Sequence, residues 1–208
     1  RDLHSFPTRR SSDLVGAEYR ISRTLTKTTP ESTRAFRYTI SGCAGGDSSI
    51  RDYHHANPIT SIGSILSSCC SDGLVVRIAS FCGGNQASQY PTNASITLVI
   101  NSSEADKLKS MLEHSREKFK DRFLKNEPAI ECTIEEVQVP RFVYSASDAS
   151  TVTNLLYTLK NDVYATGKDD NDLIALTHIG RIRMTGNHLT LGIFVRSTNR
   201  RPDRKSVV

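Results

Sequence analysis

The sequence predicts an α+β fold in which a mostly antiparallel sheet carries its helices on one face. Three observations support this prediction. Several segments alternate apolar and polar residues with a period of two, as half-buried strands do, and others repeat apolar residues at helical spacing. Neighbouring strands are joined by connections too short for a parallel crossover, which favours antiparallel pairing. The order of elements is typical of a split β-α-β arrangement of ferredoxin type, followed by a further helix and a hairpin.

The first half of the chain predicts a strand, a helix and two more strands. Residues 35–43 alternate as a strand, which the glycine-rich AGGDSS ends. A helix is expected to begin at Pro58, whose fixed φ suits the first turn and whose missing N–H is not needed there. Gly73 ends this helix, and strands are expected at 74–81 and 94–100. The apolar positions of the helix are Ile59, Ile62, Leu66 and Cys70.

The second half predicts two helices, a strand and a hairpin. Ser103 is expected to cap the next helix, with Asp106 three residues further on in a variant of the capping box. Residues 132–139 alternate as a strand, and Asp148 is expected to cap the following helix. Residues 177–196 form a predicted β-hairpin around the turn TGNH. The apolar stripe of the first of these helices is Leu108, Met111, Leu112, Phe119 and Phe123.

The two ends of the chain resemble translated sequencing adapter, read forward at residues 1–14 and as its reverse complement at 203–208. We expect both ends to be foreign, and residues 15–202 to be one domain with a flanking strand segment. The rival interpretation of the first segment is a basic arm for nucleic acid. The chain carries +5, of which each end contributes +1. The remaining +3 is too small to predict nucleic-acid binding from charge alone.

Cysteine usage and hydropathy indicate the compartment. The five cysteines are odd in number and form no C-x-x-C pair, and two of them are adjacent, at Cys69 and Cys70. This pattern predicts a reduced, cytoplasmic chain with structural thiols instead of disulfides or a zinc knuckle. No apolar run is long enough to cross a bilayer, so no membrane partner is expected.

The usual catalytic motifs are missing from the sequence. It contains no P-loop, no H-E-x-x-H, no G-x-S-x-G and no carboxylate and histidine cluster at ligand spacing. His54 and His55 are adjacent and could supply one metal ligand, although neighbouring loop histidines are ordinarily solvated. We therefore expect no metal site within the chain.

Three places remain unusual. Gly45-Gly46 and Gly83-Gly84 both follow predicted strands, where glycine serves either a turn or the close approach of another group. In LTLGIFVRS, period two puts Leu189, Leu191, Ile193 and Val195 on one face, so Arg196 belongs to the other face, away from the helices. An arginine there is either a solvated charge or a planar donor for a carboxylate.

Three motifs stand in a familiar order: AGGDSS at 44–49, ASFCGGNQASQYP at 79–91 and HIGRIRMTGNHLTLGIFVRS at 178–197. Together with the segments between them, they resemble the lid domain of the di-zinc metallopeptidases of the aminoacylase/carboxypeptidase-G superfamily. More narrowly, they are similar to the aminoacyl-histidine dipeptidase, or cytosol non-specific dipeptidase, branch. The resemblance covers nearly all of residues 15–202.

The resemblance implies a lid and dimerisation domain inserted in a zinc-dependent hydrolase of dipeptides such as Xaa-His. In such enzymes two zinc ions in a separate catalytic domain activate a water, with a glutamate as general base. The lid closes over the dipeptide and holds its carboxylate and scissile carbonyl, and it forms the contact of a homodimer. The metal-binding motifs lie before and after the lid, so this fragment is expected to bind no zinc and to be inactive alone.

The family's functional residues carry over unevenly. Arg196 matches the arginine that grips the substrate, and Gly83 and Gly84 match loop glycines near the bound peptide. Asp47 occupies the position of the lid histidine that polarises the scissile carbonyl, where an anion would repel the developing oxyanion. Ser88 stands at the family's asparagine position. Either the sequence has diverged towards inactivity or altered specificity, or His54 or His55 performs the histidine's role.

Two other functions remain open. One is a stand-alone ferredoxin-like binding module for a small ligand or RNA. Such modules stack bases on aromatic side chains, and the strand aromatics Tyr38 and Phe194 lie outside any RNA-binding signature, which disfavours RNA. The other is the lid of a catalytically dead homologue, serving as an interaction subunit.

Overall fold

The protein is built on one large antiparallel sheet. The computed structural model describes residues 14–47, 55–159, 161–166 and 173–198, and eight strands of these residues form the sheet. Its strands are β1 (Leu14–Thr24), β3 (Arg34–Ser41), β5 (Arg77–Gly83), β7 (Ala94–Ile100), β8 (Glu131–Val137), β10 (Asp162–Thr166), β11 (Leu173–Thr185) and β12 (His188–Thr198). Their order is β1-β12-β11-β5-β7-β3-β8, with β10 paired to β11.

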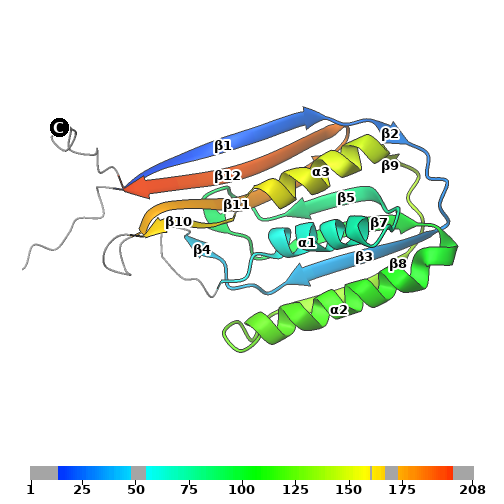
Figure 1. Cartoon of the computed structure of the whole chain (residues 1–208), viewed down its shortest axis with the longest axis horizontal. Helices are drawn as coiled ribbons and strands as arrows, with labels where there is room; N and C mark the ends of the chain where they lie inside the picture. The colour runs from blue at the N-terminus through cyan, green and yellow to red at the C-terminus, as the bar shows by residue number, and fades with distance from the viewer. Residues whose placement is uncertain (1–13, 48–54, 160, 167–172, 199–208) are drawn as a thin grey trace, which may run out of the picture.

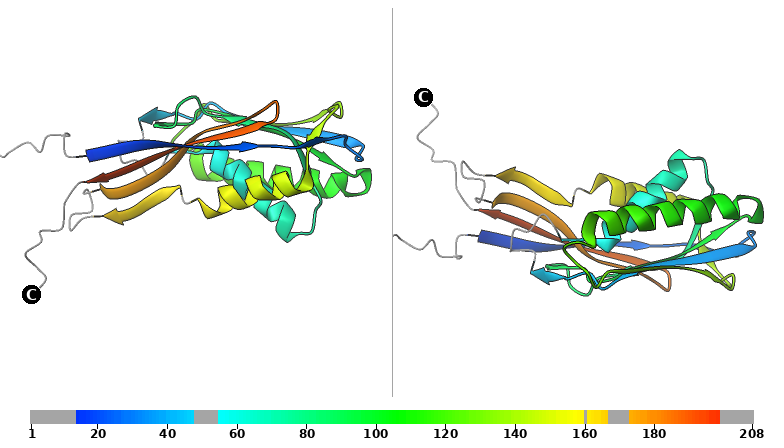
Figure 2. Two further views of the ribbon diagram at one scale, coloured as in Figure 1. Left: turned by 90° about the horizontal axis from the view of Figure 1, so that it is seen from above. Right: turned by 90° about the horizontal axis from the view of Figure 1, so that it is seen from below.

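All three helices of the described residues lie on one face of this sheet (Figures 1 and 2). They are α1 (Pro58–Ser71), α2 (Ala105–Phe123) and α3 (Ala146–Thr158). The described residues also form two short two-stranded sheets. In one, β2 (Lys27–Thr28) pairs with β9 (Val143–Tyr144), and in the other β4 (Gly46–Asp47) pairs with β6 (Gln89–Tyr90). The predicted α+β class, with helices on one face, is confirmed.

The ferredoxin-type order occupies half of the sheet. In chain order the elements β3, α1, β5, β7, α2 and β8 form a split β-α-β unit, and in space the strands run β8-β3-β7-β5. The sheet then continues beyond β5 through β11, β12 and β1, with every pairing antiparallel. This extension places β11 of the C-terminal hairpin next to the end of β5, with β12 and then β1 beyond it.

The core lies between the sheet and the helices. On the sheet, Tyr38, Ile78 and Phe81 are fully buried, and α1 contributes Ile59, Ile62 and Leu66 as predicted, each at 2 % exposure or less. Burying a large apolar side chain stabilises a fold by roughly 1.5–3 kcal/mol, so this layer provides most of the driving force. In the last turn of α1 the prediction is wrong by one residue: Cys69 is buried and Cys70 is exposed.

Helix α1 begins at Pro58, as predicted, and Asn57 is its N-cap. Asn57 accepts hydrogen bonds from the backbone N–H groups of Ile59 (3.0 Å) and Thr60 (3.3 Å), and Pro58 follows at the first helical position.

The predicted caps of the other two helices are wrong. A 3-10 turn, Ser102–Glu104, precedes α2, and its cap is Asn101, whose side chain accepts from the N–H of Ser103. α2 itself begins at Ala105 without a side-chain cap, so Ser103 and Asp106 form no capping box.

α3 is capped by Ser145, which accepts from the N–H of Asp148, the residue expected to be the cap. The Asp148 carboxylate instead accepts from the Ser145 hydroxyl and from the N–H of Thr26, both at 2.8 Å. It thereby joins the start of α3 to the segment that follows β1.

Five strands differ from their expected bounds, and two of them, β3 and β8, each begin one residue earlier and end two residues earlier than predicted. The strand expected at 74–81 begins at Arg77, because Leu74 belongs to the turn that follows α1. The C-terminal hairpin is longer than predicted, and β1 pairs along its whole length with β12, from Leu14 opposite Thr198 to Thr24 opposite His188. Leu14 is the only described residue of the two ends that the sequence predicts to be foreign, and the others lie outside the described residues.

Candidate functional site

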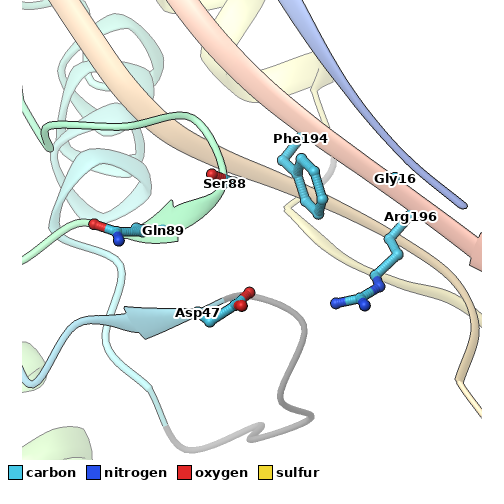
Figure 3. A pocket seen from close by; sticks show the side chains of 6 residues that line it. All are labelled: Gly16, Asp47, Ser88, Gln89, Phe194 and Arg196. Carbon is cyan, nitrogen blue, oxygen red and sulfur yellow. The ribbon is translucent and has the colours of Figure 1, made fainter. Parts of the chain in front are cut away.

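An open pocket of about 240 Å³ lies on the face of the sheet opposite the helices. It collects residues that are far apart in the sequence, from β1, from β4, from β12 and from the segment that leads into β6 (Figure 3). Its lining residues are Gly16, Asp47, Ser88, Gln89, Phe194 and Arg196. Three of the residues that the sequence singled out, Asp47, Ser88 and Arg196, therefore meet in one place.

Arg196 points into this pocket. The preceding residues Leu191 and Ile193 are buried in the core beneath the helices, and the alternation of β12 turns Arg196 to the other face. Asp47 projects from the opposite side of the pocket (Figure 3). Within the described residues the Nε of Arg196 is buried and has no hydrogen-bond partner. A buried donor without a partner is costly, so this guanidinium is suited to an anionic ligand such as a carboxylate.

Phe194 lies two residues before Arg196, on the same face of β12. Its ring extends over Gly16 of β1: a Cβ built on Gly16 would lie 2.5 Å from the ring's Cζ. Gly16 is the residue directly opposite Arg196 in the ladder. The ring therefore reaches diagonally across the sheet into the row of Arg196 and forms an apolar part of the pocket beside the guanidinium.

The segment between β5 and β6 lies flat on the sheet, because two strand glycines leave room for it. A Cβ on Gly180 would lie 2.2 Å from the carbonyl oxygen of Ala87, and a Cβ on Gly192 would lie 3.0 Å from the Cβ of Ala87. Ser88 and Gln89 follow and reach the pocket. The helix-free face of the sheet is therefore partly covered by the chain itself.

The two glycines expected near the bound peptide, Gly83 and Gly84, instead lie against other parts of the fold. Gly83 faces α1, where a Cβ would lie 2.8 Å from Cγ1 of Ile59. Gly84 has a positive φ of 63°, and its backbone packs against the carbonyl of Gly180. Arg183 donates to the carbonyl oxygens of both glycines. Neither glycine lines the pocket. Gly45 and Gly46 also have positive φ and turn the chain into β4.

His178 of β11 holds the end of the segment between β5 and β6 on the sheet. Its Nε2 lies 2.8 Å from the carbonyl oxygen of Gln89, and the Tyr90 ring packs edge-on against the imidazole at 4.5 Å. Burial lowers the pKa of His178 to about 4, more than the hydrogen bond to Gln89 raises it. The imidazole is therefore neutral at pH 7, and Nε2 is its protonated nitrogen because it must donate to the carbonyl. Its Nδ1 is buried without a partner among the described residues.

Glu127 is a buried carboxylate that the sequence gives no reason to select. It follows α2, and its two oxygens accept from the N–H groups of Ala44 and Ala56, each at 2.8 Å. His55 Nδ1 lies 3.4 Å from the same carboxylate. Glu127 thus holds the two ends of the segment that carries Asp47. Its partners are 83 and 71 residues away in the sequence, so no local pattern marks it.

Of the two histidines proposed as alternatives to Asp47, the structure describes only His55. His55 packs against the Tyr90 ring at 5.2 Å and does not line the pocket, and His54 lies outside the described residues.

The described ranges also contain no group of three or more His, Cys, Asp or Glu side chains that could hold a metal ion. No helix in the same ranges is both long enough and apolar enough to cross a bilayer. All five cysteines are free: Cys43, Cys69 and Cys132 are buried, and Cys70 and Cys82 are exposed.

No protein-family model and no curated protein matches the chain. Solved structures do match. The aminoacylhistidine dipeptidase from Vibrio alginolyticus aligns with a TM-score of 0.80 and 23% identity, over 88% of this chain and 38% of that one.

Two further structures align less well. A putative amidohydrolase/peptidase from Burkholderia cenocepacia gives a TM-score of 0.42 at 13% identity, over 59% of this chain and 29% of that chain. A putative aminohydrolase from methicillin resistant Staphylococcus aureus gives 0.38 at 17% identity, over 66% of this chain and 38% of that chain. The chain spans 38% of the length of the Vibrio dipeptidase and shares the fold of that part of it.

Proposed function

We propose that this chain is the lid and dimerisation domain of a zinc-dependent dipeptidase that hydrolyses dipeptides such as Xaa-His. The observation that carries the proposal is Arg196, which points from a sheet of the dipeptidase fold into a pocket on the helix-free face. Its buried Nε without a partner among the described residues suits the C-terminal carboxylate of a dipeptide. In the closed enzyme, the lid brings this guanidinium over the catalytic domain and fixes the substrate's acidic end.

The path of the chain supports an inserted domain. Leu14 of β1 and Thr198 of β12 are directly opposite each other at one end of the sheet (Figure 1). The chain can thus pass between this domain and a second domain twice, through two strands that lie side by side.

On this proposal, hydrolysis of the peptide bond takes place in the second, catalytic domain. Its zinc ions would supply the activated water, and the chain described here would bind and orient the dipeptide and exclude bulk water. On this proposal the chain is inactive by itself. Asp47 cannot donate a hydrogen bond to an oxyanion while it is ionised, so it does not replace the lid histidine of the family. We attribute to Asp47 either an altered specificity or a loss of activity in the parent protein. The parent is proposed to be a cytoplasmic homodimer.

RNA binding is further disfavoured as the alternative function. Tyr38 is fully buried beneath the helices, so it cannot stack on a base. Of these two strand aromatics, only Phe194 lies on the helix-free face. A module for a small carboxylate remains compatible with the pocket, and the lid of a dead homologue differs only in the flanking sequence.

Determining the source DNA on both sides of residues 15–202 tests the proposal. We expect an H-x-D segment upstream and histidine and acidic zinc ligands downstream, in one continuous reading frame. The complete frame should bind zinc and hydrolyse dipeptides. Unrelated flanks would overturn the proposal, and intact flanks without the zinc ligands would assign the chain to a dead homologue.

A further inference from the structure

We propose that Phe194 determines which dipeptides this lid accepts, by forming a flat apolar platform for the side chain of the C-terminal residue. The inference rests on the proposed function and deepens it. It assigns the substrate class as dipeptides that end in a planar side chain, such as histidine or phenylalanine, over those that end in a small or branched aliphatic one.

The first step is the relative position of two side chains. Phe194 and Arg196 project from the same face of β12, one strand period apart, and both line the pocket (Figure 3). The ring of Phe194 does not stand upright beside its own ladder partner, Glu18. It extends over Gly16, which is the ladder partner of Arg196. The Phe194 ring and the Arg196 guanidinium therefore lie next to each other in the lining of the pocket.

The second step is the geometry of a bound residue. In an amino acid, the carboxylate and the side chain leave the same α-carbon. A carboxylate held by Arg196 thus places the side chain of that residue within reach of the neighbouring ring. Aromatic rings favour offset-stacked or edge-to-face packing with a second planar group, beyond what buried area alone provides. A methyl or isobutyl group gains only the burial.

The third step is that the ring depends on the glycine beneath it. Gly16 leaves the space that the ring fills: its missing Cβ would lie 2.5 Å from Cζ and 3.0 Å from Cε2 of Phe194. Any side chain at position 16 must displace the ring. The structure thus offers two independent ways to remove the platform, one at Phe194 and one at Gly16.

The experiment uses the complete reading frame, loaded with zinc, and measures kcat/KM for Gly-His, Gly-Phe and Gly-Leu. The quantity compared is the preference for the two planar dipeptides over Gly-Leu. Phe194→Leu keeps an apolar side chain without the ring, and Gly16→Ala keeps the ring but moves it. We expect each variant to lower this preference about 2- to 10-fold relative to wild type. Arg196→Ala is the matched control, and it should lower kcat/KM for all three dipeptides by a similar factor.

The outcomes separate the two proposals. If the wild-type protein hydrolyses none of the dipeptides, the proposed function fails and the inference fails with it. If it hydrolyses them but prefers Gly-Leu, only the inference is overturned. The same holds if both platform variants retain the wild-type preference. Thermal unfolding identifies a variant that does not fold, and the preference measured with the other variant then decides.

Discussion

At the scale of single residues, Glu127 organises one side of the candidate site. It is 5 % exposed, and a buried carboxylate is tolerated only when donors surround it. Two backbone N–H groups and the His55 ring provide that environment. Because the two N–H donors come from Ala44 and Ala56, one side chain joins two points of the backbone that lie on either side of Asp47 in the sequence.

Removing Glu127 should therefore destabilise the fold. Glu127→Ala leaves the N–H groups of Ala44 and Ala56 without their acceptor, which we expect to lower the free energy of unfolding by about 2 to 4 kcal/mol. Urea unfolding of the chain measures the change. Glu131→Ala is the control, because Glu131 is exposed, and it should change the stability by no more than about 0.5 kcal/mol. Equal midpoints for the two variants would contradict this role.

At the scale of elements, the docking of the segment between β5 and β6 builds the other side of the site. Gly180 and Gly192 let the segment lie on the sheet, and His178 holds the Gln89 carbonyl. The imidazole is buried and neutral, with a pKa lowered to about 4. Protonation would place a charge in an apolar environment and would leave Nδ1–H without an acceptor among the described residues.

This arrangement predicts a dependence of stability on pH. The folded pKa of His178 is about 4 and the unfolded value is about 6.5, so between these values the unfolded chain binds the additional proton. Stability is therefore full above pH 6.5 and falls as the pH drops towards 4. From pH 7 to pH 4.5 the contribution of His178 amounts to roughly 2 to 3 kcal/mol.

His178→Gln isolates this contribution, because its amide can still donate to the Gln89 carbonyl but does not titrate in this range. Urea unfolding at pH 7, 5.5 and 4.5 should give a smaller loss of stability in the variant than in the wild type. Parallel losses in the two proteins would show that His178 does not titrate as described.

At the scale of the whole molecule, a ferredoxin-type half is extended by the four strands β11, β12, β1 and β10, and the pocket lies on the helix-free side of this extension. The cysteines report on the packing of the helix-covered side. Burial raises the pKa of Cys43 and Cys69 to about 12 and also raises that of Cys132. Cys70 and Cys82 are exposed.

The folded chain should therefore have two thiols that react quickly with a thiol reagent at pH 8, and all five should react after denaturation. Stopped-flow absorbance with a chromogenic disulfide gives both numbers. Replacing Cys70 and Cys82 by serine should abolish the fast phase. A fast phase that persists in this double variant would mean that the helices do not cover the sheet as described.

The same scale explains what could be predicted from the sequence. The orientation of Arg196 follows from the alternation within one strand, so it was predictable from nine neighbouring letters. The capping residues before α2 and α3 could not be predicted in the same way. Asn101 competes with Ser103, and Ser145 competes with Asp148, within a few residues. Local sequence does not decide between such neighbours.

Contacts between residues far apart in the sequence could not be predicted for a different reason. The pairing of β1 with β12 joins the two ends of the described chain, and the partners of Glu127 are 71 and 83 residues away. No periodicity encodes the register or the distance of such pairs. The platform formed by Phe194 over Gly16 depends on the same pairing, and it appears only once β1 is placed beside β12.

The most direct measurement of the central claim compares two arginine variants in the complete, zinc-loaded protein. Arg196→Ala should raise KM for Gly-His about 10- to 100-fold at unchanged zinc content, because it removes the charge-assisted grip on the carboxylate. Arg20→Ala removes an exposed arginine from β1 on the same sheet and should leave KM as in the wild type. Unaltered kinetics in Arg196→Ala would contradict the assignment of this chain as the lid that holds the dipeptide.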